Sequence, residues 1–257
     1  MKQERRVWMR NFKLTMEYEG TRYQGWQRLG NTEQTITGKL EAVLERMLGR
    51  SIEVHGSGRT DAGVHALGQV AHFKADTDMS AEEIFTYLNR YLPMDIRILS
   101  VQEMPLRFHS RLHAVSKTYC YRLYLGEKPP VFERNTLWCI GHELDLEAME
   151  RGAADCLGAH DFQSFCAAKR GKKSTVRTIY ECSVSSQGDL VTLRVSGNGF
   201  LYHMVRILAG TLVEIGEGVR SADSVPGLLQ AKDRTLAGPT LPSCGLTLME
   251  VRYPESL

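Results

Sequence analysis

The sequence predicts an α+β protein built from two similar halves. Three observations support this fold class: short segments alternate apolar and polar residues, longer segments have helical apolar spacing, and both kinds recur in a similar order. The length of 257 residues fits one large domain or two small ones. Hydrophobic residues make up 42% and charged residues 24%, which is typical of a globular protein.

The first half is predicted to run strand, helix, strand, loop, strand, helix, strand. Residues 12–18 alternate apolar and polar side chains, and residues 40–48 show helical spacing. Ser80 and Glu83 form a capping box in front of the second helix. The remaining elements are expected as strands at 52–54, 70–73 and 96–98 and a helix at 84–91.

The second half loosely repeats this order. Its predicted elements are strands at 118–125, 176–184, 190–195 and 246–251, with helices at 146–157 and 201–215. Each half suits a split βαβ unit, in which helices cover one face of an antiparallel sheet. Two such units could share one continuous sheet. We expect the halves to be residues 1–115 and 116–257.

Composition narrows the class of protein but not its partner. The net charge of +2 and the pI near 8.2 neither prove nor exclude a nucleic-acid partner, because local basic patches matter more. The six dispersed cysteines form no CxxC pair, so we expect free thiols and no zinc site. The charged first residues lack the apolar region of a secretory signal, and no apolar run is long enough for a membrane span. We therefore expect a cytoplasmic protein.

The stretch GSGRTDAGVHALGQ, residues 56–69, is the most unusual segment. Glycines at 56, 58 and 63 are expected to allow positive φ and close approach to a ligand. A P-loop would need a Gly-Lys-Ser/Thr ending, which is absent. Asp61 could cap a turn or act as a reactive carboxylate. Arg59 favours the second interpretation, because a cation beside a carboxylate suits a phosphate-bearing substrate.

Histidines around this loop raise the alternative of a metal site. His55, His65 and His72 lie near Asp61 in the sequence, but no HxH or HxxxH spacing occurs there. Structural or hydrogen-bonding histidines are the favoured interpretation. A metal-dependent hydrolase using His55, Asp61 and His65 stays open as an alternative.

Several segments interleave aromatic and basic residues in a way that suits nucleic acid. TRYQGWQR could stack on bases through its aromatic rings, or it could be a turn in which Trp26 anchors the core. A second such stretch runs from Phe108 to Arg122. The cationic run around Gly171 could bind phosphate or be a solvated loop. Arg206 lies in an apolar helix, where it needs a carboxylate partner; Asp61 is one candidate among several.

The loop GRTDAGVHALGQVAHF resembles the signature of the TruA-type tRNA pseudouridine synthases. Further segments match that family in the same order, from about Asn11 to Pro254: RYQGWQ, QTITGKLEAVL, FHSRLHAVSKTYCYRLY, HDFQSF, TVRTI, NGFLYHMVRILAGTLVEIG and AKDRTLAGPTLPSCGLTL. Several motifs in one order are far more specific than any single one.

The resemblance implies isomerisation of uridine to pseudouridine in the anticodon stem-loop of tRNA, at positions 38, 39 and 40, without cofactor or metal. It implies that Asp61 is the nucleophile, that Arg206 is its ion-pair partner and that Tyr119 stacks on the target base. It further implies that Arg59 displaces the base from its stem and that Leu246 lines the uracil pocket.

The same resemblance implies two ferredoxin-like halves that share one continuous antiparallel sheet, with the active-site cleft between them. The N-terminal half would carry the Asp61 loop, and the C-terminal half would carry Tyr119 and Arg206. The implied partners are a second copy of the chain and the anticodon arm and elbow of tRNA. We expect RNA contacts from Tyr23, Trp26, Gln27, Arg28, Arg111, Lys169, Arg170, Lys172, Lys173 and Arg177. A catalytically silent RNA-binding module is the main alternative.

Overall fold

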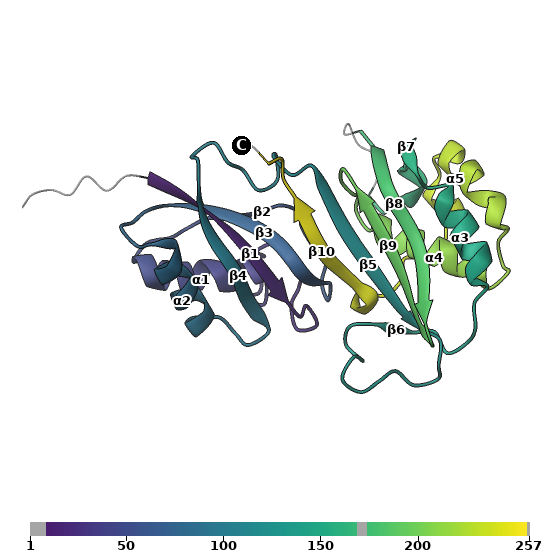
Figure 1. The fold of residues 1–257 in the computed structure, drawn as a ribbon, viewed down its shortest axis with the longest axis horizontal. Helices are drawn as coiled ribbons and strands as arrows, with labels where there is room; N and C mark the ends of the chain where they lie inside the picture. Colours follow the sequence, from purple (N-terminus) through teal and green to yellow (C-terminus); the bar gives the residue numbers. More distant parts are fainter. Residues whose placement is uncertain (1–8, 169–173, 256–257) are drawn as a thin grey trace, which may run out of the picture. The chain divides into compact units, whose positions relative to one another are not determined.

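The chain divides into two compact units, each built from strands and helices (Figure 1). The computed structural model describes residues 9–168 and 174–255. One unit comprises Met1–Val115 with Val251–Leu257, and the other comprises Ser116–Glu250. The predicted α+β class is confirmed. Among the described helices, none has both the length and the apolar character that crossing a membrane requires.

The first unit has an antiparallel sheet in the order β4-β1-β3, with β2 paired to β3. The alternation predicted for its first strand is confirmed, because Phe12, Leu14 and Met16 are fully buried. Phe12 stacks on Phe73 of the neighbouring strand with ring centroids 5.4 Å apart. The elements of this unit are β1 (Met9–Tyr18), α1 (Ile36–Leu48), β2 (Val54–Gly56), β3 (His65–Asp76), α2 (Ala81–Tyr91) and β4 (Ile96–Met104).

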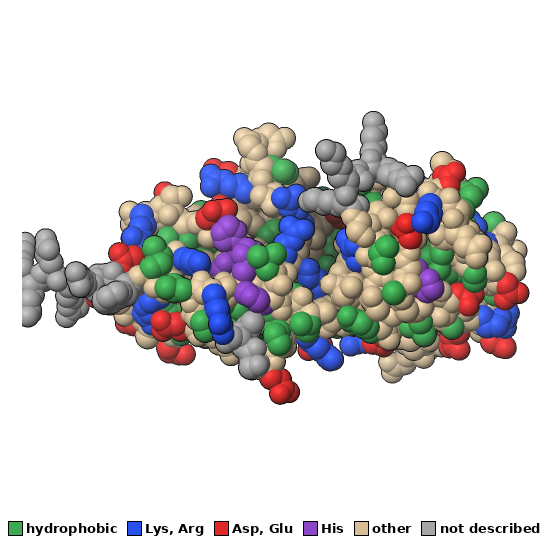
Figure 2. Space-filling view, turned by 90° about the horizontal axis from the view of Figure 1, so that it is seen from above, with side chains coloured by type: hydrophobic (Ala, Val, Ile, Leu, Met, Phe, Trp, Pro, Cys, Tyr) green, Lys and Arg blue, Asp and Glu red, His purple; other side chains and the backbone are tan. Residues whose placement is uncertain are grey.

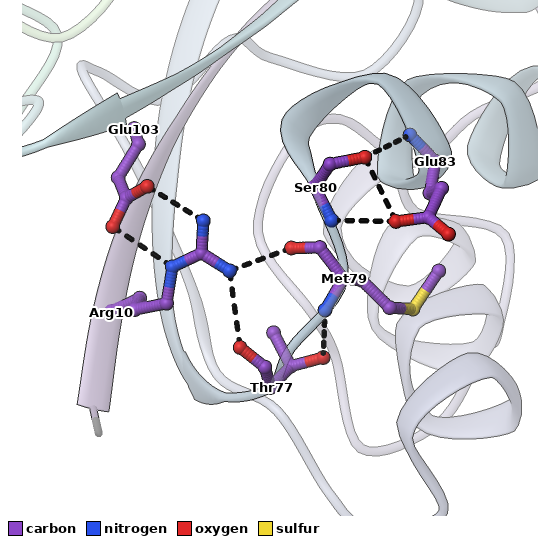
Figure 3. A network of polar contacts seen from close by, with 6 residues as sticks. All are labelled: Arg10, Thr77, Met79, Ser80, Glu83 and Glu103. Atoms are coloured by element: carbon purple, nitrogen blue, oxygen red, sulfur yellow. Dashed lines mark hydrogen bonds and ion pairs between the residues drawn. The ribbon is translucent and has the colours of Figure 1, made fainter. Parts of the chain in front are cut away.

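Local sequence signals set the start of α2. The Ser80 side chain accepts a hydrogen bond from the Glu83 backbone, and the Glu83 side chain accepts one from the Ser80 backbone, which confirms the capping box (Figure 3). Close by, Arg10 forms a bidentate ion pair with Glu103 at 2.6 and 2.8 Å. Arg10 also donates to the Met79 carbonyl at 2.7 Å. This network ties the start of α2 to the edge of the sheet.

The second unit has the strand order β10-β5-β9-β8-β7. Its helices α3 and α4 contact each other, and α3 also packs on β8. The strand β6 pairs with β5 in parallel, so the expectation of a purely antiparallel sheet is wrong at this point. The elements are β5 (Ser116–Tyr124), β6 (Trp138–Cys139), α3 (Leu146–Ala154), β7 (Gly158–Asp161), β8 (Val176–Gln187), β9 (Leu190–Gly197), α4 (Met204–Gly216), α5 (Val225–Ala231) and β10 (Leu246–Arg252).

Some boundaries differ from those predicted. The helix α4 begins at Met204 rather than at residue 201, because His203 has a left-handed φ of 61°. The strand β3 begins at His65, five residues earlier than expected, because glycine and polar residues interrupt its alternation. The short elements β6, β7 and α5 were not predicted, since two to seven residues are too few to show a period. All six cysteines carry free thiols.

Candidate active site

The loop that carries Asp61 connects β2 to β3, and a buried polar network fixes its path. Ser57 Oγ donates to Gln69 Oε1 at 2.8 Å, and Gln69 Nε2 donates to the Gly58 carbonyl at 3.2 Å. The hydroxyls of Tyr18 and Thr60 lie 2.8 Å apart. All of these side chains are buried. Since a buried polar group without a partner costs about 1–3 kcal/mol, alternative paths of the loop are disfavoured.

Tyr18 remains neutral in this network, because burial raises the pKa of its hydroxyl to about 12. The network was not predicted from the sequence. The one signal for it was Gln69, a polar residue directly before the strand expected at 70–73.

The backbone of the RYQGWQ segment, residues 22–27, packs against the Asp61 loop. Trp26 N donates to the Thr60 carbonyl at 3.0 Å, and Gly63 N donates to the Tyr23 carbonyl at 3.2 Å. Gly25 has a φ of +90°, and a Cβ there would lie 2.7 Å from the Thr60 carbonyl oxygen. Only glycine permits this approach. The RYQGWQ segment and the Asp61 loop, which match the family as two separate motifs, therefore form one structure.

The glycines of the loop have different roles from those expected. Gly63 has a positive φ of 77°, but Gly56 and Gly58 do not. A Cβ at Gly56 would lie 2.5 Å from the Trp26 indole, so this glycine makes room for a buried side chain rather than for a ligand. The expectation of positive φ is therefore wrong for Gly56 and Gly58.

Within the loop, exposure alternates from residue to residue. Asp61 is half-buried and Arg59 is exposed, whereas Thr60 between them is buried. The buried Thr60 is bonded through both its hydroxyl and its carbonyl. The loop therefore has an anchored centre, with the carboxylate of Asp61 and the guanidinium of Arg59 on either side.

The other predicted catalytic residues belong to the second unit. Tyr119 lies on β5, is 8% exposed, and meets the ring of Phe200 edge-on with centroids 5.1 Å apart. Arg206 lies in the first turn of α4, is half-buried, and donates from Nε to the Leu241 carbonyl at 2.7 Å. Leu246 is the buried first residue of β10, next to β5 in the sheet. Apolar packing and one backbone acceptor thus orient the Tyr119 ring and the Arg206 guanidinium.

Two of the aromatic residues expected to contact RNA lie in the core instead. Tyr23 and Trp26 are each 3% exposed. Tyr23 donates to Asp95 Oδ1 at 2.6 Å, and burial raises the pKa of its hydroxyl. Their ring faces are therefore inaccessible to bases, which supports the other interpretation, that Trp26 anchors the core.

The basic and polar residues expected at the RNA surface are more scattered. Gln27, Arg28 and Arg111 are exposed, and Arg28 lies 3.3 Å from Glu41 Oε2. Arg177 on β8 is half-buried, and burial lowers the pKa of its guanidinium. The run of Lys169, Arg170, Lys172 and Lys173 lies outside the described residues.

The histidines near the loop make hydrogen bonds with the backbone. His65 Nδ1 accepts from Gly20 N at 2.9 Å, and His72 Nδ1 accepts from Ser110 N at 3.2 Å. Within residues 9–168 and 174–255, no group of three or more His, Cys, Asp or Glu side chains is arranged to hold a metal ion. This geometry does not support the hydrolase alternative with His55, Asp61 and His65 as its metal site.

Comparison with known proteins identifies the family. The family model for tRNA pseudouridine synthase matches residues 14–112 and 153–254. The chain is 43% identical over 245 residues to tRNA pseudouridine synthase A 2 of Bacillus cereus (strain ZK / E33L), which covers 95% of this chain and 100% of the relative. It is 46% identical over 230 residues to tRNA pseudouridine synthase A of Bacillus sp. (strain KSM-64), covering 90% and 94%.

A third relative, tRNA pseudouridine synthase A of Geotalea daltonii, is 45% identical over 245 residues, covering 95% of this chain and 100% of the relative. A chain of a solved Cbf5-Nop10-Gar1 complex overlaps 79% of this chain and 45% of its own length, at 12% identity. Its TM-score of 0.33 is too low to support any inference. On the sequence matches, which extend over nearly its whole length, this chain belongs to the tRNA pseudouridine synthase family.

Proposed function

We propose that this chain forms pseudouridine in the anticodon stem-loop of tRNA, at positions 38, 39 and 40, with Asp61 as the nucleophile. Membership of the family makes it an isomerase that converts uridine to pseudouridine in tRNA. The observation that carries the assignment of Asp61 is its loop, in which a buried network and a glycine-dependent backbone contact hold one half-buried carboxylate. Such preorganisation is what nucleophilic catalysis requires.

The reaction needs one carboxylate and no external electron donor. Asp61 would form a covalent bond to the ribose or to the uracil ring while the C1′–N1 glycosidic bond breaks. The ring turns, C5 bonds to C1′, the bond to Asp61 breaks to restore its carboxylate, the C5 proton is lost and N1 gains a proton. The product has the same atoms as the substrate, so electrons balance without a cofactor.

The residues of the second unit would complete the site. We assign Tyr119 to stacking on the target base, Leu246 to the wall of the uracil pocket and Arg206 to pairing with Asp61. A guanidinium beside a carboxylate favours its ionised, nucleophilic form. The Leu241 carbonyl supports this role, because it fixes the orientation of the Arg206 side chain. The exposed Arg59 is suited to displace the base and fill its place in the stem.

Partners and location follow from the resemblance. We propose that Gln27, Arg28, Arg111 and Arg177 contact the anticodon arm and elbow of tRNA, together with the basic run from Lys169 to Lys173. The exposed positions of the first three support this assignment. We also propose that the chain acts as a homodimer in the cytoplasm.

The decisive test replaces Asp61 and measures both chemistry and binding. We expect Asp61→Asn and Asp61→Ala to lower the rate of tritium release from 5-labelled uridine in tRNA by about 10⁴-fold or more. Binding of tRNA in a filter assay should stay within about threefold of wild type, because a single carboxylate adds little to phosphate binding. Asp189→Ala, on an exposed turn of the second unit, is the matched control and should retain full activity.

Undiminished tritium release by either Asp61 variant would overturn the mechanism. Binding of tRNA without release by the wild type would instead favour a silent RNA-binding module. Mapping pseudouridine in tRNA from cells with and without the protein tests the position separately. Loss of pseudouridine only outside positions 38–40 would contradict the anticodon assignment and leave the mechanism intact.

A further inference from the structure

Four histidines of the first unit lie close together outside the Asp61 loop. His55 on β2 lies opposite His72 on β3, and their rings stack with centroids 5.0 Å apart. The ring of His109, in the segment after β4, lies 4.7 Å from that of His72 and 5.6 Å from that of His55. His113 accepts a hydrogen bond from the His109 backbone at 2.9 Å. We call these four residues the histidine cluster; Figure 2 shows histidines gathered on this unit with Lys and Arg side chains near them.

Backbone amides determine which nitrogen carries the proton in the rings of His109 and His113. At His72, Nδ1 is shared between Ser110 N at 3.2 Å and Ser110 Oγ at 3.0 Å. Arg111 N donates to His109 Nδ1 at 3.1 Å, and His109 N donates to His113 Nδ1. A backbone N–H can only donate, so Nδ1 of His109 and of His113 is an acceptor and each neutral ring is protonated on Nε2. Protonation of Nδ1 would therefore break a hydrogen bond, and a nearby anion would offset this cost by stabilising the charged ring.

The surroundings of the cluster also disfavour positive charge. Burial, with added repulsion from the other rings and from Lys74, lowers the pKa of His72 to about 4. Burial also lowers the pKa of His109, with smaller contributions from the neighbouring rings and from Arg111. The rings of His72 and His109 thus stay short of positive charge in the isolated protein, although imidazole is the side chain that titrates most readily near neutral pH.

Nearby carboxylates do little to stabilise positive charge on the histidine cluster. Among the described residues, Glu53 is the one carboxylate within ion-pairing distance of the cluster, with Oε2 3.6 Å from His55 Nε2. The Glu53 side chain is 78% exposed, so water screens it. On the neighbouring strand β1, Lys13 lies opposite His72, and its ammonium group sits over the ring of Tyr253. The cluster and its surroundings therefore form a predominantly basic surface.

We propose that the half-buried His55, His109 and His113 of the histidine cluster, with the exposed Lys74 and Arg111, form a contact surface for the phosphate backbone of RNA, and that RNA binding there is coupled to proton uptake. This inference rests on the proposed function, that the chain binds tRNA. A phosphodiester is negatively charged at every pH from 6 to 8, so its approach stabilises protonated imidazoles. By linkage, protonation strengthens RNA binding by the same factor, and affinity rises as pH falls.

The position of the cluster supports an RNA contact rather than an isolated structural role. His55 directly precedes Gly56, where β2 ends and the Asp61 loop begins. Ser110 Oγ donates to the His55 carbonyl at 2.6 Å, which ties the His109 segment to the base of that loop. The cluster is therefore connected through the first unit to the loop that carries the candidate nucleophile.

The test measures the dissociation constant of an unmodified tRNA transcript between pH 8 and pH 6 at constant ionic strength. An average uptake of about half a proton over these two pH units would make wild-type binding about tenfold tighter at pH 6 than at pH 8. His109→Gln and His55→Gln should reduce this change to about threefold or less. His109→Arg carries a permanent charge, so it should bind at pH 8 nearly as tightly as the wild type at pH 6. His142→Gln, on an exposed side chain of the second unit, should keep the wild-type response.

Circular dichroism of each variant confirms that it is folded at both pH values. If both Gln variants keep the full tenfold response, the inference is wrong even though tRNA binding and pseudouridine formation stand. If the wild type does not bind the transcript at all, the proposed function itself fails. A His109→Arg variant that responds to pH like the wild type would also overturn the coupling.

Discussion

The two units bury different kinds of polar side chain. In the described part of the second unit, the buried polar residues are small hydroxyl side chains only: Ser116, Thr118, Ser164, Thr211 and Thr247. The first unit also buries the amides and imidazoles of Asn11, His65, Gln69 and His72. Amide groups need several partners each, so Gln69 joins several side chains into a network in the first unit, whereas the buried hydroxyls of Ser164 and Thr211 in the second unit bond to the backbone.

This difference shows two ways of holding a residue that we propose to be catalytic. The Asp61 loop has little apolar bulk, and buried hydrogen bonds specify its path. Arg206 lies instead on α4. All the remaining residues of this helix except Glu214 are buried, and most of them are apolar. A hydrogen-bond network specifies one geometry, but it loses much of its stabilising free energy when one member is removed. Apolar packing tolerates substitutions of similar volume with smaller losses of stability. The first unit should therefore be the more fragile in function.

The largest expected effect comes from a matched pair of substitutions, Gln69→Leu and Leu212→Ala. Each should lower the free energy of unfolding by about 2–4 kcal/mol, the first by removing the hydrogen bonds of Gln69 to Ser57 Oγ and to the Gly58 carbonyl and the second by leaving a cavity in α4. Only Gln69→Leu should also lower kcat, by about 100-fold, because the Asp61 loop moves. Urea unfolding and tritium release measure the two effects. Equal kcat values in the two folded variants would break the comparison.

Acid should affect the first unit through His72. Its folded-state pKa of about 4 lies below the ordinary value of 6.5, so below pH 6.5 the unfolded chain binds the proton more readily. The stabilisation is fully present above pH 6.5 and is lost as pH falls from 6.5 toward 4, by up to about 3 kcal/mol. Urea unfolding at pH 7.5, 6 and 5 measures this loss. His72→Asn should be less stable at pH 7.5 but lose less on acidification; an unchanged loss would assign the effect to another group.

The smallest effect sharpens the comparison within the second unit. Gly227 lies in α5, and a Cβ added there would meet no atom within 4 Å, so Gly227→Ala should raise the free energy of unfolding by about 0.5–1 kcal/mol. Gly210 in α4 is the contrasting control, because a Cβ there would lie 2.0 Å from the Pro239 carbonyl oxygen. Thermal unfolding of both variants measures the difference. Similar melting temperatures would mean that the backbone near Pro239 yields easily.

Much of the fold could be predicted from local sequence signals. The alternation around Phe12 and the capping box of Ser80 and Glu83 act within a few residues, so their structural consequences are visible in the sequence. The late start of α4 could not be predicted, because the conformation of His203 depends on its tertiary surroundings. The role of Gly56 was missed for a similar reason, since its neighbour Trp26 is thirty positions away.

By itself the sequence determined the α+β class, the order of the main elements and the family, because periodicity and motif order are properties of the chain. It also singled out Asp61 through the glycines and the arginine beside it. Only the tertiary structure decided that Tyr23 and Trp26 are core residues, that Gln69 and Tyr18 support the Asp61 loop, and that the histidines form one cluster. These contacts join residues far apart in the chain, and burial, which sets their energies, exists only once the chain has folded.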